Sequence, residues 1–159
     1  MLECNTTTTP VEVGNTVCKG SLGEETVDPT LFRQIIGSLR YVCNSRPYIA
    51  YRVGVISRHM EDPRASHMQA AKKLLRYLKG SLDYGVHFPK AGQMKQKEIY
   101  GYTNVDWCGD KDDRKSATGY FFKFESASIS WSSKKQEVVA LSSCEAEYID
   151  VCLGACQGL

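Results

Sequence analysis

The sequence predicts an α+β chain in which a helical unit is followed by a three-stranded sheet and one further helix. Residues 29–80 carry apolar positions at helical spacing, and prolines mark the points where the pattern restarts. Residues 99–132 hold three short alternating or aromatic runs separated by turn residues. After Leu141 the pattern returns to that of a helix. The length of 159 residues, with 42% hydrophobic and 24% charged residues, is ordinary for a globular protein.

The first part of the chain is expected to be an extended arm and three helices. Residues 1–28 have no sustained period and predict an extended N-terminal arm, and residues 29–90 predict the helical unit. Asp28 can cap the first helix, which runs to residues 43–44; the second starts at 46–47 and reaches about residue 60. The third starts at 62–63 and ends at Gly80. The expected apolar positions are Phe32, Ile35, Ile36, Leu39 and Val42, then Ile49, Val53 and Ile56, then Met68, Ala71, Leu75 and Leu78.

The second part is expected to begin after a short strand at residues 82–88 and a polar linker at residues 91–98. The first strand of the sheet runs from Ile99 to Trp107, and alternation puts Tyr100, Tyr102, Asn104 and Asp106 on one side of it. Residues 119–124 and 128–132 predict the second and third strands. Ser126 and Ala127 between them suit a tight hairpin, so these two strands are expected to be antiparallel neighbours.

A helix is expected after Leu141. The spacing of Ser142 and Glu145 is that of a capping box, which gives Glu145 a structural role. Glu147 lies about 200° further around the helix and is therefore expected to face something else. Apolar residues spaced by four and three predict the buried stripe of this helix: Ile149, Leu153 and Cys156.

Several classes of protein are disfavoured by composition. No apolar run reaches the length of a membrane span, and residues 1–10 lack the features of a secretory signal. We therefore expect an intracellular protein and not a secreted effector. Seven cysteines without a CxxC pair argue against a disulfide framework or a zinc ribbon. Cys152 and Cys156 are interpreted as small buried side chains, and the histidines His59, His67 and His87 are too scattered to suggest a metal site.

Basic residues cluster on the third helix although the net charge is only +2. Six basic residues and no acid lie between residues 64 and 79: Arg64, His67 when protonated, Lys72, Lys73, Arg76 and Lys79. Such a face is most often simply solvated. The alternative is contact with nucleic-acid phosphates, which would weaken strongly with salt. The mixed-charge run 111–115 is interpreted as a solvated loop.

Two long stretches carry a family resemblance. GYTNVDWCGDKDDRKSATGYFF and ISWSSKKQEVVALSSCEAEYI resemble the ribonuclease H domain of copia-type retrotransposon polyproteins, in order and spacing over some fifty residues. The resemblance implies a ribonuclease H-like fold. It also implies an enzyme that cuts the RNA strand of RNA/DNA hybrids, with Mg²⁺ ions as cofactor held by carboxylates, because Mg²⁺ prefers hard anionic oxygens.

The family's metal-binding positions fall on Asn104 and Glu147. Asn104 occupies the place of the first family aspartate and offers a neutral oxygen instead of a carboxylate, so a divalent ion loses compensating charge. Asp106 is about 6–7 Å further along the strand, too far to substitute without rearrangement. Glu147 matches the family glutamate. The next family aspartate follows a later strand and has no counterpart before Leu159.

Asp150 is a second departure, because the family has a small apolar residue there. It is interpreted as a drifted position, with a spare metal ligand as the alternative. The segment FRQIIGSLRYVCNSRPYIAYRVGVISRHMEDPRASHMQAAKKLLRYLKGSLDYGV resembles the polyprotein segment that joins reverse transcriptase to ribonuclease H, which implies a thumb or connection unit. Residues 1–12 resemble the sequence just after the reverse transcriptase palm.

Three hypotheses follow. The favoured one is a segment of a copia-type polyprotein, with a truncated ribonuclease H-like domain at residues 99–159, that is inactive as a nuclease. The second is a module that binds RNA/DNA hybrid or duplex nucleic acid through the basic helix together with Ser132 and Lys134. The third is a metal-dependent nuclease that uses Asp106, Glu147 and Asp150 or is completed by a second chain. Without a fourth strand the first strand has an open edge, which predicts self-association.

Overall fold

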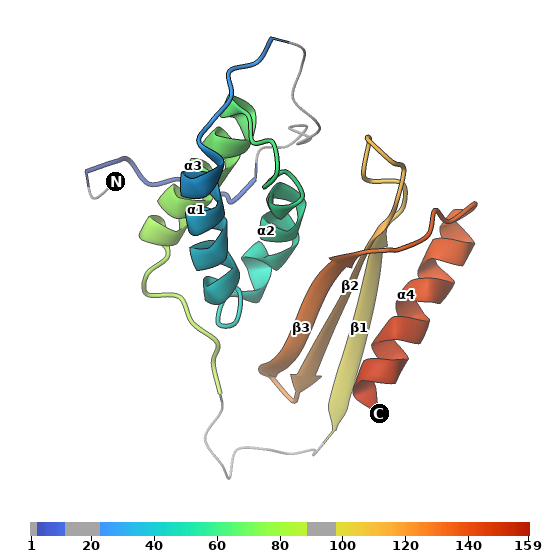
Figure 1. Ribbon diagram of the computed structural model, residues 1–159. Coiled ribbons are helices and arrows are strands. Elements are labelled where there is room, and N and C mark those ends of the chain that lie inside the picture. Colours follow the sequence, from blue (N-terminus) through green and yellow to red (C-terminus); the bar gives the residue numbers. More distant parts are fainter. Residues whose placement is uncertain (1–2, 12–22, 89–97) are drawn as a thin grey trace. The chain divides into compact units, whose positions relative to one another are not determined.

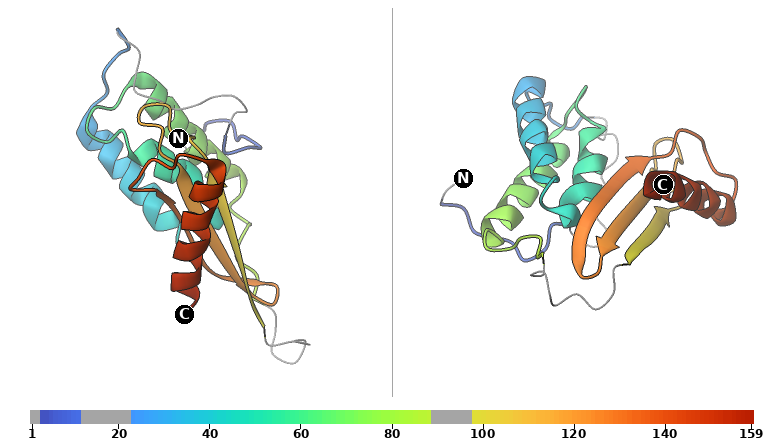
Figure 2. Two further views of the ribbon diagram at one scale, coloured as in Figure 1. Left: turned by 90° about the vertical axis from the view of Figure 1, so that its right-hand side faces the viewer. Right: turned by 90° about the horizontal axis from the view of Figure 1, so that it is seen from below.

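The computed structural model describes residues 3–11, 23–88 and 98–159, which belong to two compact units (Figures 1 and 2). Residues 1–85 form the helical unit, and residues 86–159 form the sheet unit. Among the described residues, the named elements of the first unit are all helices, and the second unit combines a three-stranded antiparallel sheet with one helix. The predicted α+β class is therefore confirmed. Nearly all of the expected linker, residues 91–97, lies outside the described residues.

The helical unit contains α1 (Pro29–Val42), the short 3₁₀ helix η1 (Pro47–Ile49), α2 (Ala50–Ser57) and α3 (Ala65–Gly80). At the start of α1 the backbone N–H of Thr30 donates to the Asp28 carboxylate at 2.8 Å, and Pro29 occupies the first turn, as predicted. The second predicted helix is shorter than expected and divides into η1 and α2. The strand expected at residues 82–88 is wrong, because no neighbouring segment among the described residues supplies a hydrogen-bonding ladder.

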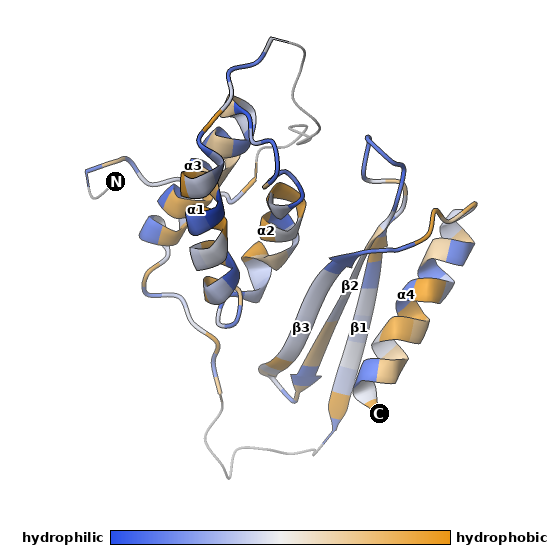
Figure 3. Cartoon of the chain, in the orientation of Figure 1, coloured by the Kyte–Doolittle hydropathy of each residue, from blue (hydrophilic) through white to orange (hydrophobic). Residues whose placement is uncertain are grey.

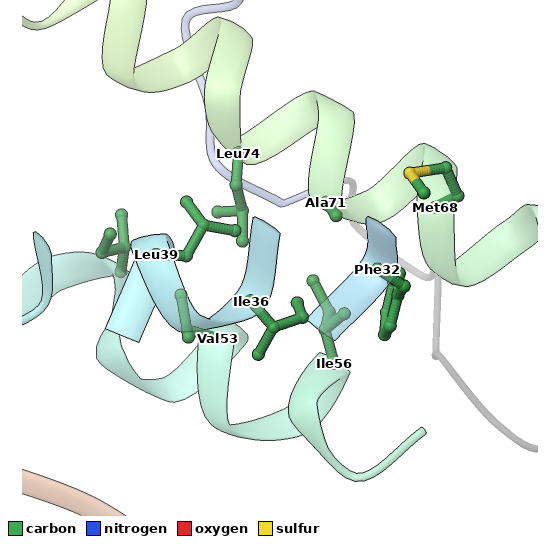
Figure 4. Packing of buried hydrophobic residues seen from close by; sticks show 9 residues of the cluster. Phe32, Ile36, Leu39, Val53, Ile56, Met68, Ala71 and Leu74 are labelled. Atoms are coloured by element: carbon green, nitrogen blue, oxygen red, sulfur yellow. The ribbon is translucent and has the colours of Figure 1, made fainter. Parts of the chain in front are cut away.

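The core of the helical unit lies where its three α-helices meet. The face of α1 turned to the viewer in Figure 3 is mainly polar, and the apolar side chains point inward in Figure 4. The predicted stripe on α3 included Leu75 and Leu78, which are only partly buried. Leu74, which was not predicted, is fully buried instead. Each fully buried large apolar side chain contributes roughly 1.5–3 kcal/mol. The buried cluster consists of Phe32, Ile36, Leu39, Ile49, Val53, Ile56, Met68, Ala71 and Leu74.

The described parts of the predicted arm, residues 3–11 and 23–28, pack against α3 without forming a helix. Lys79 donates to the backbone carbonyl of Cys4 at 2.8 Å. Glu24 accepts from the backbone N–H of Ser66 at 2.6 Å, which satisfies one of the free donors in the first turn of α3. Thr26 forms an isolated antiparallel bridge with Arg64. The N-terminal segment therefore has fixed contacts at both ends of α3.

The sheet unit contains β1 (Ile99–Asp106), β2 (Ala117–Phe124), β3 (Ala127–Lys135) and α4 (Ser143–Gly158). The strand order is β1-β2-β3, and both pairs are antiparallel. The predicted hairpin between the second and third strands is confirmed, with Glu125 at a φ of +53° in the turn. All three strands were expected, but β2 and β3 are longer than predicted. Helix α4 lies along one face of the sheet, over β1 and β2 (Figure 2).

Candidate functional site

Asn104 lies near the end of β1, in a regular ladder that places it opposite Gly119 of β2. Its neighbour Thr103 is held against α4, because a Cβ added to Gly154 would meet the Thr103 methyl group at 2.6 Å. Side chains alternate along a strand, so Asn104 points to the sheet face that α4 does not cover. The residue is exposed. Asp106 shares this face by the same alternation, as the sequence predicted.

Glu147 lies in the first turns of α4, where the capping prediction is confirmed. The backbone N–H of Glu145 donates to the Ser142 hydroxyl at 3.1 Å. The Glu145 carboxylate in turn accepts from the N–H of Leu141 at 2.7 Å, so it is committed to the start of the helix. Glu147 is exposed and takes no part in the cap. Of the two glutamates, Glu147 is therefore the one free to act on a ligand.

The buried face of α4 differs from the predicted stripe. Leu153 and Cys156 are exposed and Ile149 is half-buried, whereas the residues that contact the sheet are Ala146, Asp150 and Gly154. The reason is the close approach of helix and sheet at Gly154, which leaves room for small side chains and none for leucine. The prediction that Cys156 is buried is wrong, and so is the same prediction for Cys152, which is also exposed.

Asp150 is fully buried on the face of α4 that packs against the sheet, and neither of its carboxylate oxygens has a hydrogen-bond partner. Burial raises the pKa of this carboxyl above its ordinary value, and the charge of Glu147 acts in the same direction. The Thr118 hydroxyl and the Gly119 amide are near enough to favour the charged form, although neither meets hydrogen-bond geometry. Asp150 is therefore an uncompensated polar group inside the sheet unit, which costs stability.

Gln136 is a buried neighbour of this region that sequence reasoning missed. Its side-chain amide donates to the Thr118 hydroxyl at 2.8 Å and to the backbone carbonyl of Ala146 at 3.1 Å. Its carbonyl oxygen has no partner. Nothing in the polar run around Gln136 distinguishes it from its exposed neighbour Glu137. The region between β2 and the start of α4 is thus rich in acceptor oxygens and poor in donors.

Asp106 turns back on the loop that follows β1. The Asp106 carboxylate occupies the space that a Cβ on Gly109 would need, and Cys108 adopts a φ of +53° in this turn. The three carboxylates therefore lie in different surroundings. That of Asp106 lies in a turn, that of Glu147 is exposed to solvent, and that of Asp150 is on the buried face of α4. Within residues 3–11, 23–88 and 98–159, no three His, Cys, Asp or Glu side chains are placed to hold a metal ion.

Ion pairs connect the loop 107–116 to the sheet. Lys135 on β3 forms ion pairs with Asp110 at 2.6 Å and Asp113 at 2.7 Å. Burial opposes the shift, but the Lys135 hydrogen bond and the Lys115 backbone N–H hold the pKa of Asp113 below its ordinary value. Asp110 and Asp113 thereby tie the loop to the end of β3. Residues 111–114 are exposed, as expected of a solvated loop, and Lys115 is half-buried.

The basic cluster of α3 is smaller in the structure than in the sequence. His67 is buried, accepts the Arg64 backbone N–H at its Nδ1 and stacks on His59, so it is not part of the exposed face of α3. Arg64 pairs with Asp62 at 2.6 Å, and Lys79 is held by a backbone carbonyl. Lys72 is exposed, while Lys73 and Arg76 are half-buried.

The two strand residues assigned to the same nucleic-acid surface lie on β3. Ser132 is half-buried and pairs with Tyr120 of β2. Lys134 is largely exposed and forms an ion pair with Glu137 at 3.4 Å, a contact that is weak at such exposure. Among the described residues no helix is long and apolar enough to cross a membrane.

Comparisons with known proteins give long matches to polyproteins of transposons. The chain is 43% identical over 129 residues to the Retrovirus-related Pol polyprotein from transposon RE1 of Arabidopsis thaliana, covering 81% of this chain and 9% of that protein. It is 47% identical over 120 residues to the corresponding polyprotein from transposon TNT 1-94 of Nicotiana tabacum, covering 74% of this chain and 9% of that protein. The chain therefore spans less than a tenth of either polyprotein.

A third relative is similar in length to this chain. It is the Secreted RxLR effector protein 161 of Plasmopara viticola, 44% identical over 115 residues, which cover 72% of this chain and 79% of that protein. No family model matches the chain, and no solved structure matches it. The resemblance found in the sequence is confirmed by the transposon relatives, and the chain belongs to the family of copia-type retrovirus-related Pol polyproteins.

Proposed function

We propose that this chain is a segment of a copia-type Pol polyprotein whose ribonuclease H-like part no longer cleaves RNA/DNA hybrids. In this proposal the helical unit corresponds to a thumb or connection element, and the sheet unit to the first part of a ribonuclease H-like domain. The order of three antiparallel strands followed by a helix that carries Glu147 supports the second assignment. The observation that carries the loss of activity is Asn104 in place of the first family aspartate.

The described residues do not fit the pair of Mg²⁺ ions that the family resemblance implies. Such ions are held by several carboxylates, and an amide at position 104 removes one negative charge from the set. Asp106 cannot compensate, because its carboxylate is folded onto the turn at Gly109. Asp150 cannot compensate either, because it is fully buried on the sheet side of α4. Glu147 is left as the one family carboxylate exposed among the described residues.

The direct test is cleavage of a labelled RNA/DNA hybrid by the purified full chain with Mg²⁺ or Mn²⁺. Three proteins are compared: the unaltered chain, Glu147→Ala and the matched control Glu145→Ala, which removes a neighbouring carboxylate that serves only the helix cap. We expect no cleavage from any of them above the background without protein. Circular dichroism must show that each chain is folded.

The opposite result is equally clear. Cleavage by the unaltered chain that is kept in Glu145→Ala and lost in Glu147→Ala would overturn the proposal. It would mean that another group, or a second polypeptide, replaces the charge missing at Asn104. Cleavage that is equal in all three proteins would instead identify a contaminating nuclease, and the measurement would be repeated on material purified by a second route.

A further inference from the structure

A group of buried polar side chains lies where α4 packs against β2. It consists of Thr118 on β2, Gln136 directly after β3 and Asp150 on α4, and each of these residues is less than a tenth exposed. Three oxygen atoms of the group have no hydrogen-bond partner: both carboxylate oxygens of Asp150 and the side-chain carbonyl oxygen of Gln136. Buried acceptor oxygens in folded proteins nearly always have a partner, so three of them together call for a chemical explanation.

Thr118 and Ala146 bring these oxygens close to one point. The Gln136 side-chain amide donates to the Thr118 hydroxyl at 2.8 Å and to the backbone carbonyl of Ala146 at 3.1 Å. Ala146 precedes Asp150 by one turn of α4, and helical side chains lean toward the helix N-terminus, so the Asp150 carboxylate lies over the turn that Gln136 contacts. The same carboxylate lies near the Thr118 hydroxyl and the Gly119 amide. The oxygens of both side chains are therefore gathered around Thr118.

The negative charge of Asp150 has no positive side chain beside it in the part of the chain that the structure describes. The charged side chain that acts on this carboxylate is Glu147, which is itself negative. Lys135 at the end of β3 forms its ion pairs with Asp110 and Asp113 of the loop instead. A buried charge without a counter-charge is strongly unfavourable. A positive ion taken up from solution would remove this cost.

We propose that the group binds one alkali-metal cation such as Na⁺, held by the Asp150 carboxylate, the Gln136 carbonyl oxygen and the Thr118 hydroxyl oxygen. Carboxylate, carbonyl and hydroxyl oxygens are the ligands that hard cations prefer. One carboxylate balances one positive charge, whereas a divalent ion would leave a net charge buried. The cation would fasten α4 to β2. This role goes beyond the proposed function, because it does not depend on whether the chain cleaves nucleic acid.

The site belongs to this chain and to the interior of its sheet unit. Position 150 is one of the places where the sequence departs from the family that it resembles, which has a small apolar residue there. The unpartnered oxygens of Asp150 and Gln136 are closed off from solvent. A segment outside the sheet unit would therefore not reach them without a rearrangement of α4. The ligand oxygens come from β2, from the residue after β3 and from α4 alone.

The test is the stability of the sheet unit in the full chain, followed by tryptophan fluorescence in urea, because both tryptophans belong to this unit. NaCl is compared with choline chloride at equal ionic strength, which separates binding from screening. At ten times its dissociation constant, Na⁺ should lower the unfolding constant about elevenfold. In choline chloride Asp150→Ala should be the more stable chain, and its advantage should shrink as NaCl replaces choline chloride.

Three further variants define the site. Asp150→Asn keeps the size of the side chain and removes its charge, and it should lose the response to Na⁺. Glu137→Gln is the matched control, because it removes the same charge from an exposed neighbour of Gln136 and should keep the response. Thr118→Ser retains the hydroxyl and should keep the response, whereas Thr118→Val should weaken it. Circular dichroism of each variant checks that the fold is kept.

Sodium NMR gives an independent readout of binding. The resonance of Na⁺ should broaden in the presence of the unaltered chain and broaden less with Asp150→Asn. Equal stability in NaCl and choline chloride, without such broadening, would overturn the proposal and leave the oxygens to a buried water molecule or a proton. A response to Na⁺ that persists in Asp150→Asn would overturn it as well, because the ion would then bind elsewhere. A response to Mg²⁺ or Ca²⁺ alone, lost in Asp150→Asn, would refute the assignment to a monovalent ion.

Discussion

The helical unit packs nine buried hydrophobic residues into one cluster, whereas every buried hydrophobic residue among the described positions of the sheet unit is an alanine. The interior of the sheet unit is completed by polar side chains: Ser116, Thr118, Gln136 and Asp150. Large apolar residues of the sheet unit, such as Leu153 and Tyr148, are exposed instead. The two units have similar lengths, so chain length does not explain the difference.

The difference indicates two sources of stability. Burial of large apolar side chains stabilises the helical unit directly. The sheet unit depends more on its strand ladders, the cap at Ser142 and the ion pairs of Lys135, which are partly screened by water. It also contains the unpartnered carboxylate of Asp150. We therefore expect the sheet unit to unfold more easily than the helical unit.

Phe32→Ala should have the largest effect and should separate the two units. Phe32 is fully buried in the centre of the helical cluster, and such a truncation destabilises by about 3–5 kcal/mol. Both tryptophans, Trp107 and Trp131, belong to the sheet unit, so tryptophan fluorescence reports on it alone. In a urea titration the far-ultraviolet circular dichroism transition should shift while the fluorescence transition stays in place.

Leu31→Ala is the control for this comparison, because Leu31 precedes Phe32 on α1 and is largely exposed. It should change either transition by less than about 0.5 kcal/mol. Equal shifts of the fluorescence and circular dichroism transitions in Phe32→Ala would contradict the comparison. They would show that the two units unfold as one cooperative block.

Asp150→Ala should stabilise the sheet unit. It removes a buried carboxylate that has no hydrogen-bond partner and restores the small side chain that the close helix contact favours. We expect a gain of roughly 1–3 kcal/mol at neutral pH in the fluorescence-detected urea transition. Glu147→Ala, one turn earlier and exposed, should leave the transition nearly unchanged. A loss of stability in Asp150→Ala would show that the carboxylate has a favourable partner in solution.

The same carboxyl should make the sheet unit more stable in mild acid. Burial raises the folded-state pKa of Asp150 above its ordinary 3.8, so the folded state binds this proton more tightly than the unfolded chain. Stability therefore increases as the pH falls through the folded-state pKa toward 3.8. The lowered pKa of Asp113 acts in the opposite direction but below this window, since that contribution is lost only as the pH falls below about 3.8. Fluorescence-detected urea midpoints at several pH values should show the gain in the unaltered chain and lack it in Asp150→Ala.

The elements of the fold could be predicted because local signals mark them. Asp28 and Pro29 begin α1, and Ser142 with Glu145 begins α4, each through contacts within a few residues. The buried face of α4 could not be predicted in this way. Hydrophobic spacing favoured Leu153, but the short distance between α4 and β1 selects Ala146 and Gly154, and that distance is a tertiary property.

The candidate site also combines features that local sequence predicts with features that depend on tertiary contacts. The roles proposed for Asn104 and Glu147 come from the family resemblance of the sequence, and both residues are exposed in the structure. The burial of Asp150 depends on which turn of α4 meets β2, and the ion pairs of Lys135 join segments about 25 residues apart. Local patterns carry no information on such contacts.

Ser142→Ala should give the smallest effect and tests whether a small loss of stability is confined to the sheet unit. It removes the acceptor for the Glu145 N–H, which costs about 1 kcal/mol at a helix start. Ser143→Ala, at the next position, is the matched control, since its hydroxyl is not the one that caps the helix. Because the sheet unit lacks a large apolar core, 1 kcal/mol is a substantial fraction of its stability and should appear in the fluorescence transition. Far-ultraviolet circular dichroism also includes α4, so a part of that signal should shift together with the fluorescence, whereas the larger part from α1, α2 and α3 should not move. A shift of this larger part would show that α4 contributes to the stability of both units.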